Sequence, residues 1–181
     1  MRRGARLAWA LGSLSTLVAT GAGAQAFAGH DSSAPVDFAA DRIEVLGRAD
    51  RAVLTGSVVA QQANLTLTAD RVTVSYTNAS GIDVKRLDAT GGVTVKRQGE
   101  SARGETAIYD LDRRIITLVG GVQLTRGTDV LRGGRLMIDL ASGRSVMEGS
   151  ATRQTDDSGT AIGRTGGRVT GRFTVPKRSG G

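Results

Sequence analysis

Between residues 38 and 149 the chain repeats a short alternation of hydrophobic and polar residues, rich in Val, Ile, Leu and Thr. Alternation with a period of two over about five residues predicts β-strands that have one apolar and one polar face. No stretch in this part has convincing helical periodicity, so we predict an all-β body of many short antiparallel strands. The predicted strands are residues 42–46, 52–55, 58–61, 65–68, 71–76, 85–89, 93–97, 106–110, 115–119, 122–126, 135–139 and 145–148.

Two landmarks repeat along this body. A step of glycine, a small residue and valine begins at Gly56, Gly91 and Gly120, with a weaker echo at Gly149, so the spacings are 35, 29 and 29 residues. The strand starts ADRIEV, ADRVTV, GETAIY and GGRLMI begin at residues 40, 69, 104 and 133, and are separated by 29, 35 and 29 residues. Both landmarks have six extra residues in the same interval, and we predict an inserted loop there, at residues 77–81.

A period of 29 residues suits about four short strands with tight turns. It therefore indicates a stacked or rolled antiparallel sheet and argues against a βαβ fold. Glycine at each step suits a positive φ or a sharp bend between strands, so we interpret these glycines as structural.

The alternation also assigns side chains to the two faces of the sheet. A rolled sheet has one apolar face toward its interior and one polar face toward water. That interior is either an ordinary packed core, which the residues by themselves favour, or a groove that accepts acyl chains. The predicted interior residues are Val58, Leu65, Leu67, Val72, Val74, Val93, Val95, Tyr109, Val122, Leu124, Leu136 and Ile138.

The N-terminus is typical of a targeting segment. A basic start, an apolar run at residues 7–19 and the sequence AQA at residues 24–26 predict a cleaved signal peptide at residues 1–26, with an uncleaved anchor as the alternative. The mature chain is then expected outside the cytoplasm. Residues 27–37 form a predicted flexible leader, residues 38–150 the β body, and residues 151–181 a glycine-rich basic tail with one possible extra strand.

Charge and composition exclude several functions. The net charge of +7 comes from three basic residues in the first six and five in the last eighteen, which leaves 16 basic against 17 acidic residues in between. A nucleic-acid-binding domain would carry this excess on its folded body. The chain has no cysteine and one histidine, His30 in the leader, which excludes thiol nucleophiles, iron–sulfur clusters and multi-histidine metal sites. We predict no catalytic residue, metal or cofactor.

The repeated strand starts, each followed by a glycine step, resemble the OstA-like domain. This domain is shared by lipopolysaccharide transport proteins: LptA, LptC and the N-terminal part of LptD. The resemblance covers roughly residues 37–149, and the signal peptide, the single small domain and the basic ending are most similar to the LptA type. The resemblance implies a twisted β-jellyroll, open at both ends, in the periplasm. In the family, acyl chains lie inside the roll, the sugars stay outside, and no enzymatic step is required.

The resemblance also implies partners. In the family, lipopolysaccharide passes from an LptC-like protein at the inner membrane to an LptD-like protein at the outer membrane, and copies can associate head to tail. An open roll leaves strand edges that can pair with neighbours. We expect the edge with Ile43 and Val45 to face the LptC-like partner. The edge with Val146, and residues 169–175 if they form a strand, is expected to face the next copy or the LptD-like partner.

Two rival functions follow from the residues. One is a non-enzymatic extracytoplasmic β-repeat protein with a structural or adhesive role, whose interior would take no lipid. The other is a carbohydrate-active enzyme, which would need two carboxylates on one concave face. We rank the enzyme last because the predicted interior is aliphatic.

Overall fold

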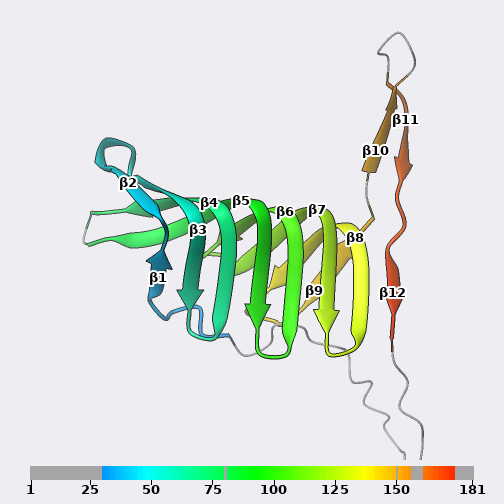
Figure 1. Ribbon diagram of the computed structural model, residues 1–181, viewed down its shortest axis with the longest axis horizontal. Coiled ribbons are helices and arrows are strands. Elements are labelled where there is room, and N and C mark those ends of the chain that lie inside the picture. The colour runs from blue at the N-terminus through cyan, green and yellow to red at the C-terminus, as the bar shows by residue number, and fades with distance from the viewer. Residues whose placement is uncertain (1–29, 80, 150, 156–160, 174–181) are drawn as a thin grey trace, which may run out of the picture.

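The computed structural model describes residues 30–79, 81–149, 151–155 and 161–173, and Figure 1 shows their arrangement. The predicted signal peptide lies outside the described residues, as do residues 174 and 175 of the possible C-terminal strand. A short 3₁₀ helix, η1 (Gly47–Ala49), precedes β3. The strands are β1 (Val36–Ala39), β2 (Arg42–Leu46), β3 (Arg51–Gln62), β4 (Leu65–Thr77), β5 (Asp83–Arg97), β6 (Glu100–Asp110), β7 (Ile115–Arg126), β8 (Asp129–Asp139), β9 (Ser145–Glu148), β10 (Ala151–Thr155), β11 (Ala161–Gly166) and β12 (Thr170–Arg172).

Successive hairpins build the main sheet. Its order is β1-β3-β4-β5-β6-β7-β8-β12, with β2 also paired to β3 and β9 also paired to β8. All these pairings are antiparallel. The strands lie side by side as a bent roll, and the separate β10–β11 hairpin projects from the β8 end (Figure 1). The sheet does not close on itself, which confirms the all-β, open jellyroll.

The glycine steps lie inside long strands, and this corrects the prediction of many short strands. The register between β4 and β5 shifts between Thr68 and Arg71 on β4 and skips residues 91–93, which include Gly91 and Gly92, on β5. Gly91 and Gly92 have φ values of 83° and 56°. Such a bulge bends a strand without ending its pairing. Each repeat therefore contains two long bent strands, because a bulge interrupts the sequence alternation just as a turn does.

The bulges divide the sheet into two packed half-sheets. Half-sheet A contains residues 58–62, 65–69, 93–97, 100–104, 122–126 and 129–133, and half-sheet B contains residues 51–55, 71–77, 83–90, 105–110, 115–119 and 135–139. At the ends of half-sheet A lie β1 and β12, and at the ends of half-sheet B lie β2 and β9. The roll thus has an N-terminal end at β1–β2 and a C-terminal end at β9–β12.

The hydrophobic core lies between the half-sheets. All twelve predicted interior residues belong to one buried cluster, and Leu124, the most accessible of them, is only 6% exposed. Their inward orientation is therefore observed, and their contact with lipid stays a prediction. Within the described part of the chain, no helix has the length and hydrophobicity needed to cross a membrane.

Candidate functional site: an apolar mouth at the N-terminal end

An apolar pocket opens at the N-terminal end of the roll. It has a volume of about 170 Å³, and its walls come from β1 to β5. We call this the apolar pocket. Its lining residues are Phe38, Ile43, Val45, Ala52, Leu54, Val74, Tyr76, Ile82 and Val84.

Several of these side chains are far more exposed than core residues. Ile43 is 51%, Val45 66% and Ile82 78% exposed. Strand β2 positions the first two, because Ile43 pairs with Leu54 and Val45 with Ala52, so all four lie on the same face. Ile82 directly precedes β5, and the end of β4 and the start of β5 extend past the N-terminal end of the roll (Figure 1). A contiguous exposed apolar surface of this kind is typical of a binding site.

A second, larger pocket adjoins the first. Its volume is about 570 Å³, and it shares Phe38, Ile82 and Val84 with the apolar pocket. One wall is the chain segment 30–36 that precedes and enters β1, which we call the strap. We call this cavity the strap pocket, and we call the two adjoining pockets together the mouth. Its remaining lining residues are Ser32, Ser33, Ala34, Pro35, Val36, Gln62, Asp83, Leu111 and Asp112.

Gln62 holds the strap against the roll. Its side-chain nitrogen donates hydrogen bonds to the backbone oxygens of Ser32 (3.0 Å) and Ala34 (2.9 Å). Its side-chain oxygen accepts a bond from the Tyr109 hydroxyl (2.6 Å) and lies 3.1 Å from Nε2 of His30. Gln62 is only 2% exposed, and these contacts satisfy its amide. Burial raises the pKa of Tyr109, which keeps its hydroxyl available as a donor.

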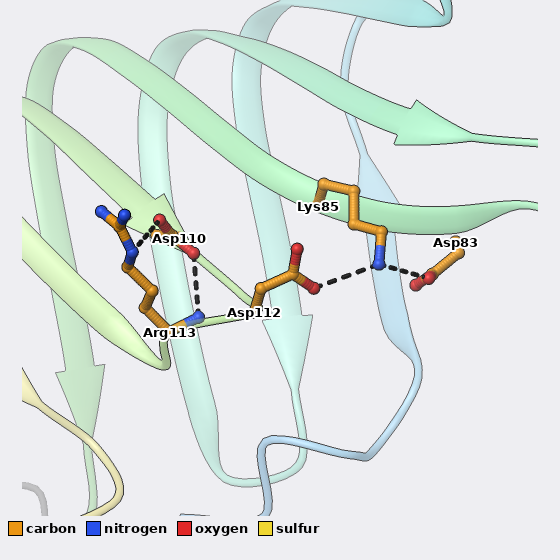
Figure 2. Close-up of polar contacts among 5 residues, drawn as sticks. All are labelled: Asp83, Lys85, Asp110, Asp112 and Arg113. Carbon is orange, nitrogen blue, oxygen red and sulfur yellow. Dashed lines mark hydrogen bonds and ion pairs between the residues drawn. The ribbon is translucent and has the colours of Figure 1, made fainter.

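An ion-pair cluster forms the rim of the strap pocket. The Lys85 ammonium lies 2.6 Å from the Asp83 carboxylate and 3.1 Å from the Asp112 carboxylate, so it bridges the start of β5 to the β6–β7 turn (Figure 2). Hydrogen bonds to Asp83 and Asp112 raise the pKa of Lys85. In the same turn, Arg113 lies 3.8 Å from Asp110 and donates its backbone N–H to it. The cluster ties together the two hairpin ends beside the mouth.

The mouth brings together residues that were predicted to have separate roles. Val74, a predicted interior residue, lines the apolar pocket together with Ile43 and Val45, the predicted partner edge. The other predicted interior residues do not line it. Val146 lies at the opposite end of the roll, half-buried on β9 and paired with Met137 of β8.

Sequence reasoning missed Phe38, Ile82 and Gln62 as parts of the site. A signal for Gln62 existed, because it follows Val58 and Ala60 at the inward positions of the alternation, where a polar residue is unusual. Nothing in the local pattern marked Phe38 or Ile82, since the mouth forms only when the roll is assembled.

The chemistry available at the mouth is that of binding. Its lining is apolar on one side, with serine, glutamine and carboxylate groups on the other. Among the described residues, no group of three or more His, Asp or Glu side chains is placed to hold a metal ion. An apolar cavity with a few polar groups is the general form of a small-molecule site.

Comparisons with known proteins agree with this architecture. The family model described as "LptA/(LptD N-terminal domain) LPS transport protein" matches residues 38–144. An uncharacterized protein of Rhizobium meliloti (strain 1021) is 28% identical over 126 residues, which are 66% of this chain and 68% of that protein. The crystal structure of LptH, the LptA-homologous periplasmic component of lipopolysaccharide transport from Pseudomonas aeruginosa, has a TM-score of 0.65 at 16% identity. That match covers 81% of this chain and 99% of LptH, and at this identity it shows a shared fold.

Proposed function

The chain belongs to the LptA/(LptD N-terminal domain) family of lipopolysaccharide (LPS) transport proteins, and from this premise we propose that it carries LPS across the periplasm as part of a protein bridge. The acyl chains are shielded by the aliphatic interior, and the protein performs no chemical step. The observation that supports this proposal is the apolar mouth, where exposed Ile43, Val45 and Ile82 lead to a continuous aliphatic core.

Shielding is what such a lipid requires. Each CH₂ group that leaves an apolar environment for water costs about 0.8 kcal/mol, so a lipid with several acyl chains crosses water very slowly without a carrier. A channel lined by Val, Leu and Ile removes this cost at every point of the route. Transfer between similar channels then needs no catalysis, and its direction is set by energy supplied elsewhere.

Entry of an acyl chain requires the half-sheets to part. In the structure the interior is filled by its own side chains: Val72, Val93 and Val95 are 0% exposed. The half-sheets are covalently continuous along the bulges, whereas their hairpin ends are linked by side chains such as Gln62 and Tyr109. We infer that the roll widens on the hairpin side. An acyl chain that enters the apolar pocket then replaces core contacts between the half-sheets with contacts of its own.

The strand edges at the two ends supply the partner surfaces in this proposal. All residues of β2 are exposed, and β3 is its pairing partner in the described sheet. We assign β2 to the LptC-like partner at the inner membrane. We assign β9, which pairs with β8, to the next copy or to the LptD-like partner at the outer membrane. Backbone pairing at an edge gives affinity without a deep interface.

Site-specific photo-crosslinking tests the proposal. A photoreactive residue at Leu67 or Leu124, both buried between the half-sheets, is expected to label LPS in cells. Their outward-facing sequence neighbours Thr66 and Gln123 are the matched controls and are expected to give little labelling. Labelling only at the outward positions would refute transport through the interior. The same reagent at Ile43 and at Val146 is expected to capture two different proteins, and one shared partner would refute the assignment of the two ends.

A further inference from the structure

The two pockets of the mouth differ in chemistry although they are continuous. The apolar pocket is lined by hydrocarbon and aromatic side chains, whereas the strap pocket adds two serines, Gln62 and the carboxylates of Asp83 and Asp112. Phe38, Ile82 and Val84 line both cavities. One amphiphilic molecule can therefore place its hydrocarbon part in the first pocket and its polar part in the second.

We propose that the strap pocket binds the uncharged, hydroxyl-bearing sugar region of a glycolipid whose hydrocarbon chain occupies the apolar pocket. The inference rests on the proposed function, and it adds a headgroup preference to it. The pocket volume of about 570 Å³ lies within the range of small-molecule sites.

The lining suits a sugar in two ways. Carboxylates accept hydrogen bonds, and bonds from hydroxyl groups to an ionised carboxylate are about twice as strong as neutral ones. Asp83 and Asp112 remain about 63% and 64% exposed at their side chains, so oxygens of both are accessible beside the pocket. The ring of Phe38 offers an apolar surface to the C–H groups of a sugar.

The charges at the pocket oppose a phosphate headgroup. The two charged residues that line it are both acidic, and the adjoining Lys85 ammonium is engaged by both of them. Asp31, beside the lining residue Ser32, adds a third carboxylate, which already accepts the Ser33 hydroxyl at 2.6 Å. Arg113 is paired with Asp110 and does not line the pocket. Among the described residues, no cation lines the strap pocket, so a phosphate there would lie beside groups of like charge, which is unfavourable for binding.

Two detergents with the same tail provide the test. Dodecyl maltoside and dodecyl phosphate, each below its micelle concentration, are titrated into the protein, and the methyl signals of Ile43 and Ile82 are followed by NMR. Ile43 lines only the apolar pocket, so it reports the tail, whereas Ile82 lines both pockets. We expect both detergents to shift Ile43. We expect dodecyl maltoside to bind about tenfold more tightly, which is the effect of one charge-assisted hydrogen bond.

The double variant Asp83→Asn/Asp112→Asn sharpens the test. It is expected to lower the affinity for dodecyl maltoside about tenfold, because the charged acceptors are lost. It is expected to raise the affinity for dodecyl phosphate, because Lys85 loses both carboxylate partners. The matched control is Asp88→Asn, which removes an acid paired with Arg86 on the outer face of β5 and is expected to change neither affinity.

The outcomes distinguish a failure of the sugar preference from a failure of the proposed lipid carrier function. If both detergents shift Ile43 with equal affinity, or if the double variant leaves their ratio unchanged, the sugar preference is overturned and hydrocarbon binding at the mouth stands. If neither detergent shifts Ile43, the proposed lipid carrier function fails at this mouth, and the headgroup inference fails with it.

Discussion

The carboxylate of Asp70 lies over the backbone of Gly91, the first residue of the bulge in the neighbouring strand. A methyl group at Gly91 would overlap this carboxylate, and φ at Gly91 is 83°. Asp41 lies over Gly56 and Glu105 over Gly120 in the same way. The two repeated sequence landmarks are therefore the two sides of one contact, which recurs along the roll.

This contact predicts unequal costs for two neighbouring substitutions. Gly91→Ala is expected to lower the free energy of unfolding by about 2–4 kcal/mol, because it combines positive-φ strain with the overlap at Asp70. Gly92→Ala, with φ 56° and no atom within 4 Å of the added methyl, is the matched control and is expected to cost about 1 kcal/mol. Urea unfolding followed by circular dichroism measures both.

Removal of the acid completes this test. The double variant Asp70→Ala/Gly91→Ala is expected to recover the part of the loss that comes from overlap with the carboxylate. It is expected to remain more costly than Gly92→Ala, because the Asp70 Cβ, 2.7 Å from the added methyl group, is kept. Equal costs for Gly91→Ala and Gly92→Ala would show that the carboxylate does not constrain the bulge.

Gln62 is predicted to control the strap. Gln62→Leu removes two donors and one acceptor from a buried site, so we expect a loss of about 2–3 kcal/mol in the free energy of unfolding. Hydrogen exchange at Ser33 and Ala34 is expected to accelerate in the folded protein, because the strap loses its anchor. The exposed neighbour Gln61→Leu is the control and should change stability by less than about 0.5 kcal/mol. Unchanged strap exchange in Gln62→Leu would contradict this role.

Ionisation of the buried Tyr109 hydroxyl is expected to lower the stability of the protein at alkaline pH. Its folded-state pKa is raised above the ordinary value of 10.0 by burial. Its contribution to stability is therefore fully present below pH 10 and is lost as the pH rises through the raised value, because the unfolded chain releases this proton first. The measurement is urea unfolding between pH 8 and pH 11.5. Tyr109→Phe is expected to be less stable at pH 8 but to show a shallower decline, and parallel curves would refute the assignment.

The apolar pocket predicts a separation of binding from stability. Ile43→Lys is expected to lower the affinity for dodecyl maltoside at least fivefold, because a charged group in an apolar site must be desolvated when the tail binds. Stability should change by less than about 1 kcal/mol, since Ile43 is 51% exposed. The control is Glu44→Gln on the same strand, whose side chain pairs with Arg42 at 3.1 Å. An unchanged affinity in Ile43→Lys would place the tail elsewhere.

Alternation along the chain was enough to predict which side chains face the interior. The predicted interior residues from Val58 to Ile138 are all buried, because the period of two is a local property of any strand with one covered face. The predicted bounds of β2 and β9 are also those of the structure. The sequence-based prediction missed half of β6 (residues 100–105) and half of β8 (residues 129–134). In both segments Arg, Gly and small residues weaken the alternation of hydrophobic and polar positions.

The sequence by itself determined the strand class, the inward face and the family, because these depend on neighbours along the chain and on repeated short motifs. Only the tertiary structure decided that the glycine steps bend long strands and that the predicted leader contributes the strap and the first two residues of β1. It also decided that Gln62 meets Tyr109, 47 residues away, and that Phe38, Ile43 and Ile82 form one mouth. Such contacts depend on register and on how far each strand bends, and side-chain alternation carries no information about either.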